Sequence, residues 1–194
     1  MSMPSAKPND NRIWIRLGLG CVVAWIAYLV FFGPRDDPGG LTPPDLATSG
    51  HNVPVDFGWT VQDLDGKPVP LSSFAGKTIF LNIWATWCGP CLREMPGIEK
   101  LASNPKWQGR DIVFLAISTD IDPNVLRRFL KDRPLTGPTV LRTSTPPPPA
   151  LDSEGIPSTF IINREGKVVV SQVGTAAWDD VSVVDYLDKL TSEK

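Results

Sequence analysis

The sequence is poor in the residue types that bind metals or crosslink a fold. Its 194 residues contain three cysteines and one histidine. Three cysteines cannot build a dense disulfide framework, and a single histidine leaves few nitrogen ligands for zinc or copper. A basic excess is also missing, because 19 lysines and arginines stand against 21 acidic residues. This near-neutral balance argues against nucleic acid as a partner.

Charges are missing from one long N-terminal stretch, residues 17–32. With the three apolar residues before Arg16 it reaches about twenty residues, enough for a helix to cross the ~30 Å bilayer core. A cleaved signal peptide needs a small-residue cleavage site, which the following sequence does not offer. A lipidated cysteine fits poorly, because Cys21 lies inside the apolar stretch. We therefore predict a cytoplasmic tail at 1–12 and an uncleaved transmembrane anchor at 13–33.

The charges around this anchor predict its orientation. Lys7, Arg12 and Arg16 precede it, whereas Arg35 follows it beside two aspartates. The positive-inside rule therefore leaves the N-terminus in the cytoplasm. We expect a single-pass protein of the cytoplasmic membrane whose remaining chain lies in the periplasm or another extracytoplasmic space.

Residues 34–54 are rich in proline and glycine and predict a linker. The domain expected at 55–194 alternates strand and helix patterns. In chain order the patterns are a hairpin turn at Asp65–Gly66, buried strands at 78–84 and 111–118, a helix after each strand, a second hairpin turn at Glu165–Gly166 and a last helix after Asp180. This order predicts an α/β fold with a central mixed sheet flanked by helices and an N-terminal β-hairpin extension.

Cys88 and Cys91 lie two residues apart, between the first buried strand and a helical pattern. A structural zinc site needs four ligands, and covalent haem attachment needs a histidine where this chain has Leu92. A copper site lacks a suitable histidine as well, so we expect no metal. A purely structural disulfide would close a very small loop and constrain little chain entropy.

Redox chemistry suits the two thiols better. Cys88 lies at the start of a helix, where the unpaired N–H groups and the helix dipole favour the attacking thiolate. Cys91 follows one helical turn later, where it can resolve a mixed disulfide. Pro90 fits the first helical turn, since its missing N–H costs nothing there.

Three segments carry a resemblance to a known family. The motif WCGPC at 87–91, Pro96 and the segment GIPSTFIINREGKVV at 155–169 resemble the thioredoxin superfamily. Within it, residues 63–91 are similar to the membrane-anchored TlpA/ResA-type thiol–disulfide oxidoreductases. The resemblance covers residues 55–194 and implies a thioredoxin-like fold whose redox group is the Cys88–Cys91 pair, without a further cofactor.

The resemblance also implies roles for single residues of the motif. Cys88 would be the exposed nucleophile and Cys91 the buried resolving thiol, with Gly89 and Pro90 between them. Trp87 would lie beside the thiols at the substrate surface.

The segment around residue 157 would face the dithiol. Pro157 matches the family's cis-proline, and the backbone of Ile156 would hydrogen-bond an extended substrate strand. Pro96 matches a kink in the active-site helix.

The chain departs from the thioredoxin pattern at two places. Asn82 replaces a buried aspartate in the strand before the motif, while Glu94 matches a glutamate associated with the site in ResA-like members. Glu94 either takes the proton of Cys91 or is a solvated acid of the first helical turn; the sequence leaves both open. Four prolines prevent a helix in 141–155, which either is a passive loop or selects partners.

The resemblance predicts an extracytoplasmic thiol–disulfide oxidoreductase that reduces partner proteins. Its electrons would come from a membrane thiol carrier of the DsbD or CcdA kind. Its substrates would be apocytochromes c during cytochrome c maturation, or a copper-delivery protein for oxidase assembly. The alternatives are a thiol oxidant and a non-catalytic copper-binding or redox-sensing module. A peroxidase would carry Thr or Ser at position 85, where this chain has alanine.

Overall fold

The computed structural model describes residues 40–46 and 52–192. The predicted tail, the anchor at 13–33 and most of the linker lie outside these residues. Among the described residues, no helix has the length and apolarity needed to cross a membrane.

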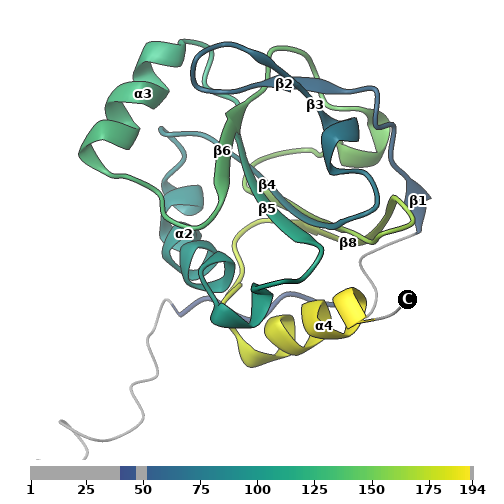
Figure 1. Ribbon diagram of the computed structural model, residues 1–194. Helices are drawn as coiled ribbons and strands as arrows, with labels where there is room; N and C mark the ends of the chain where they lie inside the picture. The colour runs from purple at the N-terminus through teal and green to yellow at the C-terminus, as the bar shows by residue number, and fades with distance from the viewer. Residues whose placement is uncertain (1–39, 47–51, 193–194) are drawn as a thin grey trace, which may run out of the picture. The chain divides into compact units, whose positions relative to one another are not determined.

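The described elements follow the predicted order closely (Figure 1). The strands are β1 (Val53–Pro54), β2 (Thr60–Gln62), β3 (Pro68–Pro70), β4 (Thr78–Trp84), β5 (Ile112–Ser118), β6 (Thr139–Arg142), β7 (Ser158–Ile162) and β8 (Lys167–Val173). The helices are α2 (Gly89–Ala102), α3 (Pro123–Asp132) and α4 (Val181–Ser192), and short 3-10 turns are η1 (Leu71–Phe74), η2 (Pro105–Trp107) and η3 (Pro149–Leu151).

The strands form one mixed sheet in the order β1-β8-β7-β4-β5-β6-β2-β3. Strand β4 lies near its centre and is buried along its whole length. It pairs in parallel with β5 and antiparallel with β7, and β5 pairs in parallel with β6. The predicted mixed sheet is therefore confirmed, and the N-terminal hairpin β2–β3 extends it beyond β6.

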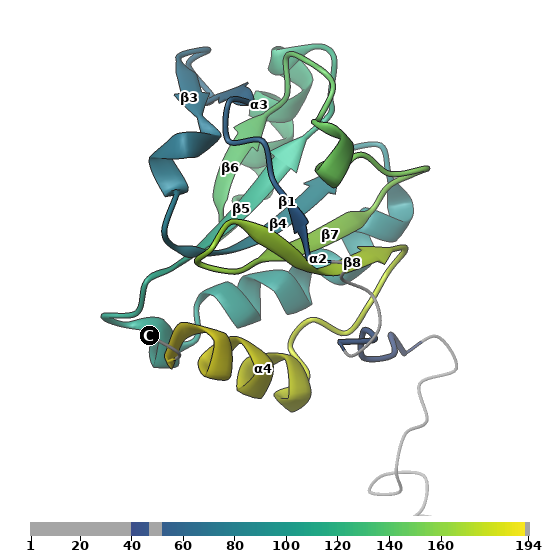
Figure 2. The ribbon, with the colours of Figure 1, turned by 90° about the vertical axis from the view of Figure 1, so that its right-hand side faces the viewer.

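The two faces of the sheet are covered differently. Even-numbered residues of β4, such as Phe80 and Trp84, pack with apolar residues of the three helices. Figure 2 shows α2 and α4 beneath the sheet. Odd-numbered residues, such as Ile83, pack with Trp59, Leu71 and other residues of the N-terminal segment and η3. The alternation follows from the strand period of two, and it divides the core into two clusters.

The local sequence signals for turns and helix starts are confirmed. Gly66 and Gly166 adopt φ values of 84° and 76° in the two hairpin turns, a region that favours glycine. Asp122 is the N-cap of α3, and its carboxylate accepts a hydrogen bond from the Asn124 N–H at 2.9 Å.

Part of the segment predicted as a linker contacts the domain. Val53 and Pro54 form β1, which pairs antiparallel with β8. The Thr42 carbonyl accepts a hydrogen bond of 2.8 Å from the Ala177 N–H. These backbone contacts satisfy groups of β8 and of the segment before α4, which the sequence pattern gave no reason to expect.

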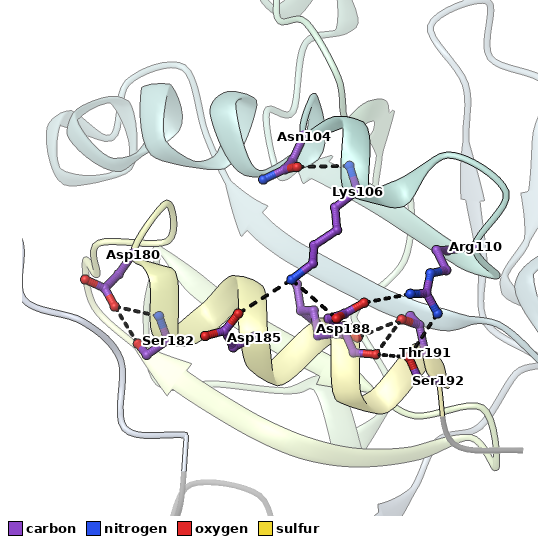
Figure 3. A network of polar contacts seen from close by, with 10 residues as sticks. Asn104, Lys106, Arg110, Asp180, Ser182, Asp185, Asp188, Thr191 and Ser192 are labelled. Atoms are coloured by element: carbon purple, nitrogen blue, oxygen red, sulfur yellow. Dashed lines mark hydrogen bonds and ion pairs between the residues drawn. The ribbon is translucent and has the colours of Figure 1, made fainter.

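Ion pairs fasten α4 to the segment between α2 and β5 (Figure 3). Lys106 contacts Asp185 at 3.5 Å and Asp188 at 3.3 Å, and Arg110 contacts Asp188 at 2.9 Å. All four side chains are partly exposed, so each pair contributes at most about 1 kcal/mol. The buried apolar face of α4, with Val183 and Leu187, holds the helix more firmly.

Candidate functional site

The two cysteines lie where β4 ends and α2 begins, and they form a disulfide with an S–S distance of 2.10 Å. Cys88 is the N-cap residue of α2, and its Sγ accepts a hydrogen bond from the Cys91 N–H at 3.2 Å. This position at the positive end of the helix stabilises negative charge on the sulfur. Pro90 lies in the first turn and Pro96 inside the helix, as predicted.

The exposure of the motif differs from the prediction in one respect. Trp87 is 72% exposed and therefore lies at the surface as expected. Cys91 is fully buried, but Cys88 is exposed over only 5% of its surface. The predicted exposed nucleophile is therefore nearly covered in the disulfide form, because its sulfur faces Cys91 and the backbone of Ile156.

The segment around Pro157 faces the disulfide. The Ile156–Pro157 peptide bond is cis, and the Ile156 carbonyl oxygen lies 3.9 Å from the Cys88 Sγ. The Pro157 carbonyl accepts a hydrogen bond of 2.8 Å from the Gly174 N–H at the end of β8. Two predicted substrate-binding residues therefore adjoin the dithiol, although they lie far from it in sequence.

Glu94 is fully buried in α2, which rules out the solvated alternative. Its carboxylate accepts hydrogen bonds from Asn82 Nδ2 at 2.9 Å, the Ala176 N–H at 3.1 Å and Trp178 Nε1 at 3.0 Å. Burial raises the pKa of Glu94 from 4.5 to about 7, because it disfavours the charged form more than the three donors favour it. A carboxyl with this pKa can accept or release a proton near neutral pH.

Asn82, which replaces the expected aspartate, links Glu94 to the sheet. Its Nδ2 also donates to Thr159 Oγ1 at 2.8 Å, while its buried Oδ1 has no hydrogen-bond partner. Donation from Asn82 Nδ2 suits the ionised form of Glu94, because an ionised carboxylate can only accept hydrogen bonds. A protonated Glu94 carries an O–H donor, and rotating the Asn82 amide would present Oδ1 as its acceptor. The pair can thus satisfy either protonation state.

Sequence reasoning missed three residues around the site. Trp178 and Ala176 approach Glu94 from the segment before α4, and nothing in the local pattern indicates this. Asp120 is 3% exposed and accepts hydrogen bonds from the Thr86 N–H at 3.0 Å, Thr86 Oγ1 at 2.7 Å and Ser118 Oγ at 2.6 Å. It fixes the backbone just before Trp87. Its position two residues after a buried strand was the available signal.

No group of three or more histidine, cysteine, aspartate or glutamate side chains with metal-binding geometry occurs in residues 40–46 and 52–192.

Comparison with known proteins gives the same reading. The Redoxin family model matches residues 48–187. The thiol–disulfide oxidoreductase ResA of Bacillus subtilis is 31% identical over 184 residues, which cover 93% of this chain and 94% of that protein.

Solved structures are similar as well. A candidate protein disulfide isomerase from Bacteroides thetaiotaomicron is 31% identical with a TM-score of 0.57, covering 75% of this chain and 91% of that one. The exposed lipoprotein thioredoxin Etrx1 of Streptococcus pneumoniae is 25% identical with a TM-score of 0.54, covering 68% of this chain and 98% of that one. With its Cys88–Cys91 disulfide and thioredoxin-like fold, the chain belongs to the Redoxin family and is a ResA-like thiol–disulfide oxidoreductase.

Proposed function

We propose that this oxidoreductase is tethered to the cytoplasmic membrane and reduces disulfides of partner proteins outside the cytoplasm. The charge asymmetry around residues 13–33 supports the location. The pneumococcal relative, which is described as an exposed lipoprotein, agrees with it. The observation that carries the proposal is the dithiol at a helix N-terminus, facing Ile156–Pro157 and backed by the buried Glu94.

The cycle consists of two exchange steps. The Cys88 thiolate attacks one sulfur of the substrate disulfide, forms a mixed disulfide and releases the other substrate sulfur as a thiolate. The Cys91 thiolate then attacks the Cys88 sulfur, which forms the Cys88–Cys91 disulfide and frees the second substrate thiol. Two electrons pass from the dithiol to the substrate.

Glu94 acts in the second step. It lies one helical turn after Cys91, and a carboxylate there takes the Cys91 proton as the resolving thiolate forms. A pKa of about 7 matches this task, because the group must be ionised before the step and protonated after it.

Each turnover leaves the disulfide form, so an electron donor is required. A membrane thiol carrier of the DsbD or CcdA kind would restore the dithiol by the same exchange in reverse. The substrates we propose are the Cys-x-x-Cys-His segments of apocytochromes c, with a cysteine pair of a copper-delivery protein as the second possibility.

The reduction potential tests the direction of the reaction. The full chain, purified in detergent, would be equilibrated with glutathione or dithiothreitol, and the ratio of dithiol to disulfide measured. A potential near that of thioredoxin, ~−270 mV, supports a reductant, and a value toward ~−120 mV identifies a thiol oxidant instead. Rapid reduction of an oxidised apocytochrome peptide would support the substrate assignment. Tight Cu(I) binding without disulfide exchange would contradict catalysis.

A further inference from the structure

A cavity lies beside the dithiol, on the opposite face of the sheet from Glu94. It has a volume of about 220 Å³. Its apolar lining includes Trp59, Ile83, Ile117 and Pro147. Ile83 and Ile117 lie near the carboxyl ends of the neighbouring parallel strands β4 and β5, the edge where α/β sheets place their ligands.

Ile156 joins this cavity to the reacting sulfur. It lines the cavity, and its carbonyl oxygen lies 3.9 Å from the Cys88 Sγ. A polypeptide whose cysteine is bonded to Cys88 therefore brings residues close in sequence to that cysteine to the cavity. The volume is below the ~300–1,000 Å³ of pockets for drug-sized ligands and suits a single side chain.

The polar lining consists of three hydroxyl side chains, Thr119, Thr143 and Ser153, and two charged residues that are both acidic. Asp152 and Glu154 line the cavity and are exposed, and no basic residue is among the described residues that line it. Arg142 borders a neighbouring hollow, but its guanidinium is held by Gln62 Oε1 and the Ile121 carbonyl. The Asp152 carboxylate accepts a local hydrogen bond from the Ser153 N–H at 2.9 Å, and neither carboxylate forms one of the ion pairs of the described residues, so both can still pair with a cation from outside.

The proline-rich segment, residues 141–155, forms one side of the cavity. Thr145 accepts a hydrogen bond of 3.1 Å from Trp59 Nε1, which fastens the segment to the N-terminal part of the domain. Pro147 and residues 152–156 then line the cavity. Prolines restrict the backbone, so this segment loses less conformational entropy when a partner binds.

We propose that this cavity binds a lysine or arginine side chain of the substrate polypeptide, next to the cysteine that Cys88 attacks. The aliphatic stem contacts the apolar lining, and the cationic group reaches the carboxylates of Asp152 and Glu154. This inference rests on the proposed function and adds a specificity determinant to it.

Two series of disulfide peptides test the proposal. Within each series the peptides differ at one position, beside the first or beside the second cysteine, which carries lysine, norleucine or glutamate. Norleucine keeps the apolar stem without the charge. The rate of reduction by the full reduced chain is measured for each peptide. Reduction of the neutral reagent 2,2′-dipyridyl disulfide tests the proposed function separately.

In at least one series we expect the lysine peptide to be reduced about fivefold faster than the norleucine peptide at low salt, as a partly exposed ion pair allows. The glutamate peptide should be reduced more slowly than the norleucine peptide. The ratio of lysine to norleucine should fall toward one in 1 M NaCl, where the Debye length is ~3 Å. It should also fall in Asp152→Asn/Glu154→Gln. The control Asp132→Asn/Glu165→Gln changes the net charge equally at exposed positions outside the cavity lining and should keep the wild-type ratio.

A lysine-to-norleucine ratio of one in both series of the wild type overturns the proposal, as does a ratio that survives in Asp152→Asn/Glu154→Gln. If the double variant does not fold, Asp152→Asn and Glu154→Gln, each at an exposed position, are measured singly, and a wild-type ratio in both overturns the proposal. Failure to reduce dipyridyl disulfide and every peptide would instead refute the proposed function.

Discussion

Cys91 and Glu94 lie three positions apart in α2, so both side chains leave the helix on the same face. Both are fully buried, and water therefore has little access to the proton that Cys91 loses in the proposed cycle. The carboxylate of Glu94 can accept this proton where water does not reach it. In the proposed cycle, resolution therefore depends on these two residues, and substitutions of each should have different kinetic effects.

The cysteine variants should separate the two exchange steps. Cys88→Ser should abolish disulfide exchange, because it removes the attacking sulfur. Cys91→Ser should still attack but accumulate a covalent mixed disulfide, because nothing releases the substrate. Mass spectrometry of the chain after incubation with a disulfide peptide measures the adduct. Full turnover by Cys91→Ser would refute its resolving role.

Glu94→Gln should slow the resolving step and remove its titration near pH 7. Glutamine keeps the size of the side chain but cannot take a proton, so the rate of this step should fall about 100-fold near neutral pH, a typical loss for one acid–base group. Single-turnover kinetics between pH 5 and 9 measures the step. Glu99→Gln is the control, since Glu99 bonds the Thr136 N–H at the surface of the same helix. An unchanged pH–rate profile in Glu94→Gln would make Glu94 a purely structural residue.

At the level of elements, the segment between β8 and α4 tunes the carboxyl in α2. The ring nitrogen of Trp178 donates a hydrogen bond to the Glu94 carboxylate. The same ring packs edge-on against Phe80 of β4, with 5.1 Å between the two ring centroids. Burial is the main cause of the raised pKa of Glu94, and this segment, distant in sequence, provides two of the three hydrogen bonds that oppose it.

Trp178→Phe should raise the pKa of Glu94 further, because the lost N–H donor favours the ionised form. The pH midpoint of resolution should move upward, and stability at pH 8 should fall by about 1–3 kcal/mol. Trp107→Phe is the matched control: it removes another buried indole donor, to the Leu101 carbonyl, and should reduce stability without moving the midpoint. A midpoint that stays in place in Trp178→Phe would contradict this coupling.

The elements that the sequence predicted well are those with local causes. Strand β4 matches the predicted 78–84, and Asp122 caps α3, because continuous apolarity and a capping side chain act over few residues. The disulfide motif was recognisable for the same reason. Its near-complete burial at Cys88 was not, since the covering backbone of Ile156 comes from distant sequence.

Long-range contacts of the site could not be predicted. The donors that Trp178 and Ala176 provide to Glu94 bridge more than eighty positions, as their hydrogen bonds separate residues by 84 and 82. The acidic cavity depends likewise on Trp59, Ile117 and the proline-rich segment meeting in space. The hydrophobic periodicity and the turn residues of a sequence carry no information about contacts between distant segments.

At the scale of the whole molecule, Glu94 links folding stability to pH. Below pH 4.5 the group is protonated in both the folded and the unfolded chain. Between 4.5 and about 7 the folded chain keeps a proton that the unfolded chain loses, so the contribution of Glu94 to stability declines as pH rises through this window. The loss is complete above the folded pKa and amounts to about 3 kcal/mol.

Glu94→Gln should remove this decline, because glutamine does not titrate. The free energy of unfolding of the variant minus that of the wild type should rise by about 3 kcal/mol between pH 4.5 and 8. Urea unfolding of the oxidised full chain at several pH values measures the difference, and Glu99→Gln provides the reference. A difference that does not change with pH would mean that Glu94 titrates normally in the folded chain.

The outermost strands of the sheet have a consequence for self-association. Prolines lie on both edges: Pro54 in β1, and Pro68 and Pro70 in β3. Each lacks the N–H that an incoming strand would pair with, and each strand is only two or three residues long. An edge strand with free N–H groups would otherwise be a template for pairing with another chain. An extended substrate chain would then bind at the surface proposed around Cys88 and Ile156 and not at either edge of the sheet.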